Sequence, residues 1–361
     1  MMIILIVILA LALGVYLFMQ RPVFGKNPTG QRLQRVEQSP NYRDGSFQNL
    51  SPTEVLLKET SYIKMLREFF DKSENVAPTK KIPSVQTDLN TLTANEPTIV
   101  WFGHSSYMIR SKELTLLVDP VFSGHASPVS LFGKAFEGTD VYPVSSFPAI
   151  DIMVITHDHY DHLDYETISE FKSKTKLFVT ALGVGEHLEH WGIPKEKIVE
   201  LDWWEEKQLS DSVKFIATPG RHFSGRTFVR GKTLWASFVL QLHGYNIFIG
   251  GDSGYDTHFK TIGEKYGPFH IAMLEAGQYG KNWPQIHMVP EETVQAAKDL
   301  KTEVLLPVHW GKFVLANHDW DEPIQRVMKT SKEQGQVVTT PKIGEPVNII
   351  HIQPTTEWWN N

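Results

Sequence analysis

One short segment, Thr156-His157-Asp158-His159-Tyr160-Asp161-His162, constrains this chain most, because it places three imidazoles and two carboxylates within seven residues. The apolar run Ile152–Ile155 comes directly before it and is predicted to be a buried strand. In a turning loop the first two histidines can reach one ion, while the second aspartate and the third histidine can reach another. These are ligand types for Zn²⁺, Fe or Mn, and the chain has no cysteine for a closed structural zinc site. We therefore predict a metal centre here.

The pattern His-x-His-x-Asp-His after a strand resembles the metallo-β-lactamase superfamily of binuclear metallohydrolases. That family takes further ligands from the ends of later strands: a His, an Asp shared by both ions, and a last His. Three apolar, β-prone runs in this chain lead to residues of these types in this order, namely His222, Asp252 and His309. The resemblance implies two zinc ions (Fe and Mn being alternatives), with the following ligands: His157, His159 and His222 on one ion, Asp161, His162 and His309 on the other, and Asp252 bridging.

The fold expected for the chain is an α/β (α+β) sandwich. Short strands begin near Thr98 and form a meander that ends at Val118. Farther along, strands alternate with helices such as His258–Tyr266 and Glu322–Gln334. Two groups of strands with helices around them indicate two sheets packed face to face. The resemblance implies the four-layer αββα sandwich of the superfamily, and we assign residues 96–361 to this catalytic domain.

Residues 1–19 form an uninterrupted apolar run that would span roughly 28 Å as a helix, close to the thickness of a bilayer core. No Lys or Arg precedes the run and Gln20-Arg21-Pro22 follows it, which favours a retained transmembrane anchor over a cleaved signal peptide. Basic residues lie only on the C-terminal side. The positive-inside rule therefore predicts a single-pass protein of the cell membrane with a cytoplasmic catalytic domain. Residues 20–95, with a helix predicted at Thr53–Lys72, are expected to wrap the core as an extension.

Several residues are candidates for contacts with the substrate. The long loop from Val121 to Phe147 carries Phe122, Leu131, Phe132 and Phe136, which could receive an acyl chain, press onto a membrane or simply cover a strand edge. Arg221 and Arg226 flank His222 and could pair with phosphate oxygens, or be surface charges. His104 and Asp119 could orient ligands, or be ordinary turn residues.

Four segments together look most like N-acylphosphatidylethanolamine-hydrolysing phospholipase D and its bacterial homologues. They are Thr156–Asp164, Arg221–Arg226, Gly250–Tyr255 and Pro307–Phe313. The segment around His287 also resembles the stretch before the last ligand in those enzymes, which implies a substrate contact for this histidine. The resemblance implies hydrolysis of a phosphodiester in a membrane lipid or amphiphile by a metal-activated water, with the catalytic aspartates Asp161, Asp252 and Asp158. Asp158 is expected to orient the ligands or the water. The acid that protonates the leaving group could be Asp158, Asp161 or a solvent molecule.

Three other functions remain open from the sequence. A lactonase or other small-molecule hydrolase of the same superfamily would share the ligands but ignore lipid. A nuclease would need a basic groove or an added domain, and the net charge of -6 gives no general attraction to nucleic acid. A non-enzymatic membrane scaffold would not need seven ligand-type residues. We expect a membrane-associated protein with no nucleic-acid partner, for which a homodimer is one state that the sequence allows.

Overall fold

The computed structural model describes residues 2–352 and 356–360, and its body is built on two seven-stranded sheets. The first sheet has the order β16 (Pro346–Asn348), β3 (Ala94–Trp101), β4 (Tyr107–Lys112), β5 (Leu114–Val118), β6 (Ile150–Ile155), β7 (Thr175–Ala181) and β8 (Ile198–Leu201). The second has the order β15 (Val337–Val338), β14 (Thr302–Val308), β13 (Phe269–Glu275), β12 (Tyr245–Ile249), β11 (Ser237–Leu242), β10 (Val213–Thr218) and β9 (Glu206–Ser210).

Each sheet is antiparallel in one half and parallel in the other. Strands β5 to β8 run parallel in the first sheet, and β12 to β15 run parallel in the second. Parallel strands need crossovers and are covered on both faces, which explains the continuous apolar runs in β6 and β13. Side chains from the facing surfaces of the two sheets make one buried core.

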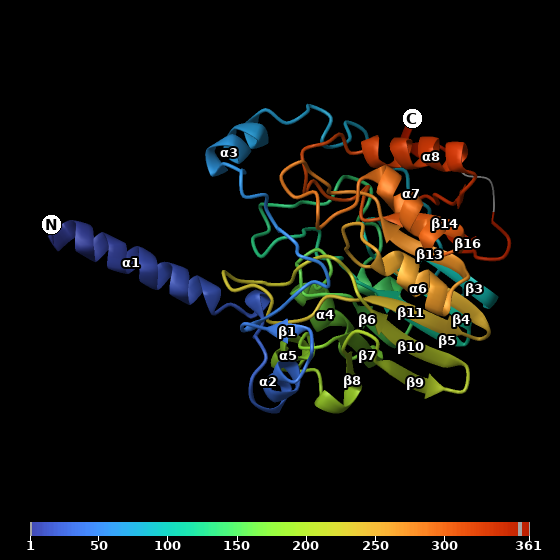
Figure 1. Ribbon diagram of the computed structural model, residues 1–361, viewed down its shortest axis with the longest axis horizontal. Coiled ribbons are helices and arrows are strands. Elements are labelled where there is room, and N and C mark those ends of the chain that lie inside the picture. Colours follow the sequence, from blue (N-terminus) through green and yellow to red (C-terminus); the bar gives the residue numbers. More distant parts are fainter. Residues whose placement is uncertain (1, 353–355, 361) are drawn as a thin grey trace.

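Helices cover the outer faces of both sheets. On the first sheet lie α4 (Tyr165–Phe171) and α5 (Gly185–His190), of which α5 contacts β8. On the second lie α6 (His258–Tyr266), α7 (Pro290–Asp299) and α8 (Glu322–Gln334), where α7 contacts β13 and β14 and α8 contacts β15 (Figure 1). The four-layer αββα architecture is therefore confirmed. The C-terminal strand β16 pairs with β3, so the two ends of this unit close on each other.

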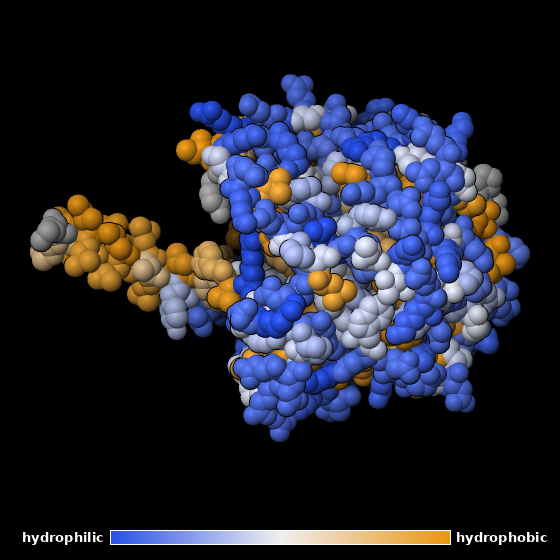
Figure 2. Space-filling view, in the orientation of Figure 1, coloured by the Kyte–Doolittle hydropathy of each residue, from blue (hydrophilic) through white to orange (hydrophobic). Residues whose placement is uncertain are grey.

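The N-terminal helix α1 (Met2–Met19) projects away from the body (Figure 1). None of its side chains is buried, and Figure 2 shows it as a continuous apolar surface. Within residues 2–352 and 356–360 it is the one helix long and apolar enough to cross a membrane. Met1, which we included in the anchor, and residues 353–355 and 361 of the expected catalytic domain lie outside the described residues.

Residues 20–95 run across the body as the 3-10 helix η1 (Pro22–Phe24), α2 (Gly30–Glu37), the strands β1 (Tyr42–Arg43) and β2 (Ser46–Phe47), and α3 (Tyr62–Phe70). The helix predicted at Thr53–Lys72 is wrong in its first half. There the backbone N–H of Glu54 donates to the side chain of Gln285, and that of Leu57 donates to the carbonyl of Asn282. These tertiary hydrogen bonds replace the ones a helix would need.

Two strands of the second sheet also differ from expectation. The apolar run that begins at Leu234 suggests a strand from that residue, but β11 begins only at Ser237, because the backbone N–H groups of Leu234 and Ala236 donate to the carbonyls of Leu182 and Thr156. Strand β13 was not predicted at all. It is the strand that brings Glu275 to the edge where the candidate ligands gather.

Candidate metal centre

The candidate ligands come together because each follows a strand that ends at the same edge of the sandwich. His157 begins the loop after β6, His222 follows β10, Asp252 follows β12 and His309 follows β14. The loops touch closely at Gly251, which has a φ of +59°, and where an added Cβ would lie 3.0 Å from Cβ of Thr156. Glycine there lets the Asp252 loop approach the histidine loop.

The first group of side chains contains His157, His159, His222 and Asp252, whose ligand atoms all lie within 4.8 Å of one another. Nδ1 of His159 lies 3.0 Å from Nε2 of His157 and 3.1 Å from Nε2 of His222. The two latter nitrogens lie 3.8 and 3.7 Å from Oδ2 of Asp252. These separations suit several donors that converge on one cation.

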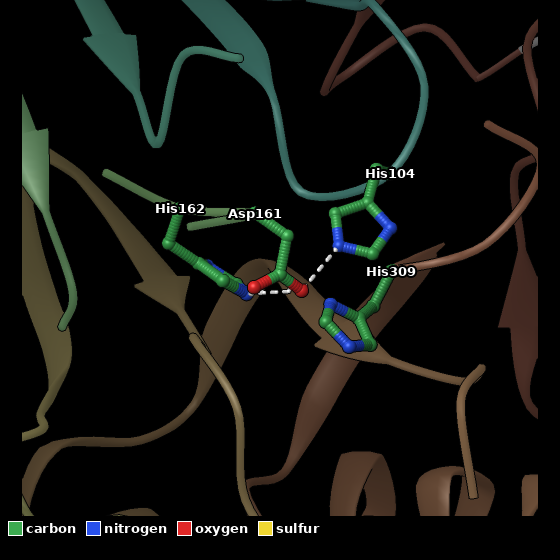
Figure 3. A group of neighbouring side chains, drawn as sticks. All are labelled: His104, Asp161, His162 and His309. Carbon is green, nitrogen blue, oxygen red and sulfur yellow. Dashed lines mark hydrogen bonds and ion pairs between the residues drawn. The ribbon is translucent and has the colours of Figure 1, made fainter. Parts of the chain in front are cut away.

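The second group contains His104, Asp161, His162 and His309 (Figure 3). Oδ2 of Asp161 lies 3.0 Å from Nε2 of His104 and 3.6 Å from Nε2 of His162. Asp252 reaches this group as well, because its Oδ2 is 3.2 Å from Nε2 of His162 and its Oδ1 is 3.1 Å from Nδ1 of His309. All seven predicted ligands therefore lie together with Asp252 between the groups, and their role as ligands stays a prediction.

The donor atoms fit metal ions. Buried Nε2 atoms of His159 and His162 and Oδ1 of Asp252 make no hydrogen bond. Burial, and then the neighbouring imidazoles, hold the pKa of His157, His222 and His309 well below the ordinary value. The result is neutral imidazole, the form that binds metal.

Negative charge is concentrated around His162. Burial alone would lower the pKa of His162. Its pKa nevertheless lies well above the ordinary value, because three carboxylates attract the protonated ring, namely Asp252, Asp161 and Asp119. Burial also raises the pKa of Asp252 to about 6, against the attraction of His162. Three carboxylates in a buried space require positive charge nearby, which divalent cations would provide.

Neighbouring groups hold the remaining ring nitrogens of the histidines. Asp119 Oδ2 lies 2.8 Å from Nδ1 of His162, and its Oδ1 accepts from the N–H of Thr156. The carbonyl of Ile286 lies 2.9 Å from Nδ1 of His222, and Ser105 Oγ lies 2.9 Å from Nδ1 of His309, the nitrogen that is also near Asp252. Such partners fix the orientation of ligating rings. Asp119 lies where the orienting role was expected, whereas Ser105 and Ile286 were not anticipated.

His287 lies beside the two groups, and its Nδ1 is 2.7 Å from Oε2 of Glu275. Glu275 is fully buried, and burial raises its pKa well above the ordinary value. Its other oxygen accepts from the N–H groups of Ser253 and Met288. Glu275 was missed with its strand, although an apolar run that ends in a carboxylate was a visible signal.

A cleft of about 330 Å³ opens over the two groups. Five of the candidate ligands, namely His159, Asp161, His222, Asp252 and His309, line it together with His287, and its other walls are largely apolar, with one guanidinium. These walls include Leu56, Met65, Phe223, Arg230, Trp283 and Leu315.

The two arginines expected to bind phosphate are committed elsewhere, so that prediction is wrong. Arg226 is buried and donates to the carbonyls of Val23, Asp158 and Leu163. Arg221 donates to Thr53 Oγ1 and to the carbonyl of Pro52. Neither arginine lines the cleft. Arg226 therefore holds the histidine loop and the segment after α1, and Arg221 holds the extension at Pro52 and Thr53.

Asp158 does not face the two groups, which corrects its assignment as a catalytic residue. Its Oδ1 accepts from the N–H of Gly225, and its Oδ2 accepts from Thr233 Oγ1 and lies 3.2 Å from Nε2 of His187. The carboxylate therefore anchors the histidine loop to two other segments. His187 of α5 is buried in this network.

The aromatic residues of the 121–147 loop divide into two kinds. Phe122 packs edge-on against Phe102 and lies against Phe147, so it belongs to the core, and its expected contact with substrate is wrong. Phe136 is buried as well. Leu131 and Phe132 are exposed, by 73% and 65%. The exposed pair alone can meet a lipid surface.

A two-sheet αββα sandwich with paired His/Asp groups at one edge indicates a metal-dependent enzyme. Residues 115–310 match the Beta-lactamase superfamily domain, more than half of the chain. The chain therefore belongs to the metallo-β-lactamase superfamily, as its sequence pattern predicted, and is a metal-dependent hydrolase of that superfamily.

Relatives of known sequence extend over most of the chain. A protein of Mycobacterium tuberculosis without an assigned function is 37% identical over 328 residues, which cover 90% of this chain and 88% of that one. The mitochondrial N-acyl-phosphatidylethanolamine-hydrolyzing phospholipase D of Saccharomyces cerevisiae is 33% identical over 237 residues, 63% of this chain and 50% of that enzyme. The fold is shared with a metallo hydrolase of Ignicoccus hospitalis, with a TM-score of 0.55 at 21% identity, over 70% of this chain and 97% of that one.

Proposed function

We propose that this protein is a membrane-anchored, two-metal phosphodiesterase that cleaves N-acylphosphatidylethanolamine-like lipids in the manner of a phospholipase D. The observation that carries the proposal is the position of Asp252 between two groups of buried ligand-type side chains, at the floor of a cleft with apolar walls. The relationship to the yeast phospholipase D supports the choice of substrate class.

The two groups would hold a pair of divalent ions, with His157, His159 and His222 on one side, Asp161, His162 and His309 on the other, and Asp252 shared. Such ions supply Lewis-acid activation of water and of a phosphoryl oxygen. Asp161 and Asp252 are the carboxylates that reach the reacting region, so they keep their assignment as catalytic residues in this proposal.

Arg230 takes the phosphate-binding role that we had expected of Arg221 and Arg226. It lines the cleft, is exposed, and its guanidinium lies 4.9 Å from the centre of the Phe223 ring. A guanidinium pairs with two phosphate oxygens at once, and the ring limits its motion. His287, held by Glu275, also lines the cleft and would contact the same phosphate.

Apolar walls suit the acyl part of the lipid. Leu56 and Met65 come from the extension, while Trp283 and Leu315 come from loops of the second half of the chain. The extension thus completes the cleft, so residues 20–95 act as part of the catalytic unit. Helix α1 would hold this cleft at the membrane, and the basic residues that follow it favour a cytoplasmic location.

The test is hydrolysis of N-acylphosphatidylethanolamine in vesicles by the purified full-length protein, with products followed by mass spectrometry. We expect phosphatidic acid and N-acylethanolamine. In heavy-oxygen water the label should enter the phosphate, because water attacks phosphorus. Arg230→Ala should raise KM for the lipid, whereas Arg221→Ala should act through stability. Rapid opening of lactones without cleavage of any phosphodiester would move the assignment to a lactonase.

A further inference from the structure

Three groups of exposed apolar side chains stand out on the body outside α1. They belong to α3, to the pair Leu131 and Phe132, and to the pair Phe228 and Val229. In Figure 1, α3 and the yellow loop that contains Gly225–Arg230 lie on the side of the body from which α1 projects. Figure 2 shows apolar residues at the surface where α3 lies.

Helix α3 has two opposite faces. Met65 lines the cleft, and Glu68 accepts a 2.7 Å hydrogen bond from Asn282, so one face is docked on the body. Ile63 and Leu66 lie on the other face, exposed by 67% and 59%. Residues three apart on a helix share a face, so these two side chains point outward together.

The charges that flank this outer face are mainly basic. Lys64 and Arg67 are exposed on α3, while the helix's own acid, Glu68, is bound by Lys281 at 2.9 Å. An exposed apolar face with Lys and Arg beside it is typical of a helix that lies in the plane of an anionic membrane surface.

The other two groups lie near the segment that follows α1. The loop with Phe228 carries Arg230 in the cleft wall, and Arg226 of the same loop binds the carbonyl of Val23, just after α1. Residues 127–130, next to Leu131, line a small cavity together with Arg21. The loop that carries Arg230 in the cleft wall is thus tied to the segment that follows α1.

We propose that α3, Phe132 and Phe228 rest on the surface of an anionic bilayer leaflet, the one from which α1 emerges, so that the metal cleft opens directly onto its lipids. This inference deepens the proposed function and rests on its membrane anchor. The outward side chains would each transfer apolar surface from water into the interface, at about 25 cal/mol per Å². A lipid would then enter the cleft beneath α3 without crossing water.

Fluorescent labels on single cysteines test the docking directly, since the chain has no cysteine of its own. Full-length Leu66→Cys, Phe132→Cys and Phe228→Cys would be labelled and reconstituted in phosphatidylcholine–phosphatidylglycerol vesicles that contain a lipid spin-labelled near the top of its acyl chain. Val337→Cys is the matched control, because Val337 is 52% exposed and pairs with Val304, at the end of β14 remote from His309.

We expect quenching at the three test positions and none at Val337. Unquenched labels at Leu66 and Phe228 would overturn the proposal, and so would cross-linking of Leu66→Cys between two copies, which would make the surface a subunit contact. Equal quenching in vesicles of phosphatidylcholine alone would show that Lys64 and Arg67 do not contribute to binding through attraction to anionic lipid.

A second variant separates docking from chemistry. Leu66→Asp with Phe228→Asp should lower hydrolysis of vesicle lipid about tenfold, as expected for a loss near 1.4 kcal/mol, and leave a short-chain soluble phosphodiester unaffected. Equal loss on both substrates would count against docking. Quenching without hydrolysis of any phosphodiester would support membrane docking and reject the proposed function. Lipid hydrolysis with unquenched labels would support the proposed function and reject the docking.

Discussion

His104 and Asp161 are 57 residues apart in the chain, yet Nε2 of His104 lies 3.0 Å from Oδ2 of Asp161 (Figure 3). Burial lowers the pKa of His104, against the attraction of Asp161. The imidazole is thus held neutral beside the carboxylate, and it can either orient Asp161 or join it as a metal ligand. Both roles make the second group of side chains depend on His104.

We expect His104→Ala to weaken metal binding at the second group by about 10- to 100-fold, because Asp161 loses its orienting partner. Competition with a chelator, measured on the purified full-length protein, gives the affinity without an activity assay. His243→Ala is the control, since His243 lies 2.9 Å from Ser111 Oγ and outside both groups. Equal affinities in the two variants would remove His104 from the centre.

Asp252→Ala should release metal from both groups, because Asp252 is the carboxylate that approaches both. Elemental analysis should find about two ions per chain in the unaltered protein and fewer in the variant, with hydrolysis reduced at least about a hundredfold. Asp256→Ala, four residues on, should keep both ions. Full activity of Asp252→Ala would refute the ligand assignment.

Arg32→Ala should destabilise the fold by about 3–5 kcal/mol, since Arg32 is bound to the largely buried carboxylates of Glu186 and Glu200, at 2.7 and 2.8 Å. Urea unfolding in detergent would measure the change in free energy. Arg35→Ala should cost about 0–1 kcal/mol, because its pair with Glu205 is exposed. Similar costs would mean that α2 is not clamped to the body.

Stability should also depend on pH through Lys312, whose amine is buried and donates to the carbonyl of Val121. Burial lowers its pKa to about 8, from 10.5, while Asp140 and Asp164 oppose the change. Between these two values the unfolded chain holds more protons than the folded one, so stability rises with pH there, by about 3 kcal/mol at most.

Lys312→Met should abolish that rise, whereas Lys260→Met, at an exposed position of α6, should keep it. Unfolding free energies measured in denaturant across the window, compared between the two variants, remove the contribution of other groups that titrate there. A parallel pH dependence in all three proteins would show that Lys312 is not the cause.

Much of the candidate site was predictable because its ligands follow strands. Apolar runs before His157, His222, Asp252 and His309 indicated strand ends, and the ends of neighbouring strands meet at an edge. Helices α6 and α8 begin and end where their apolar periodicity predicted. The helix predicted at Thr53–Lys72 does not form in its first half, because tertiary hydrogen bonds to Asn282 and Gln285 outweigh local helix propensity.

The sequence by itself determined the superfamily, the two-sheet fold and the apolar character of the N-terminal helix, because strand ends, ligand types and an uninterrupted apolar run are local properties. Only the tertiary structure decided which charged residues face the cleft. Arg226 and Asp158 are close in sequence to the candidate ligands, but they bind partners such as Val23 and Thr233, far away in the chain. The direction of a long polar side chain depends on which backbone groups folding leaves without partners nearby, and no local pattern records that.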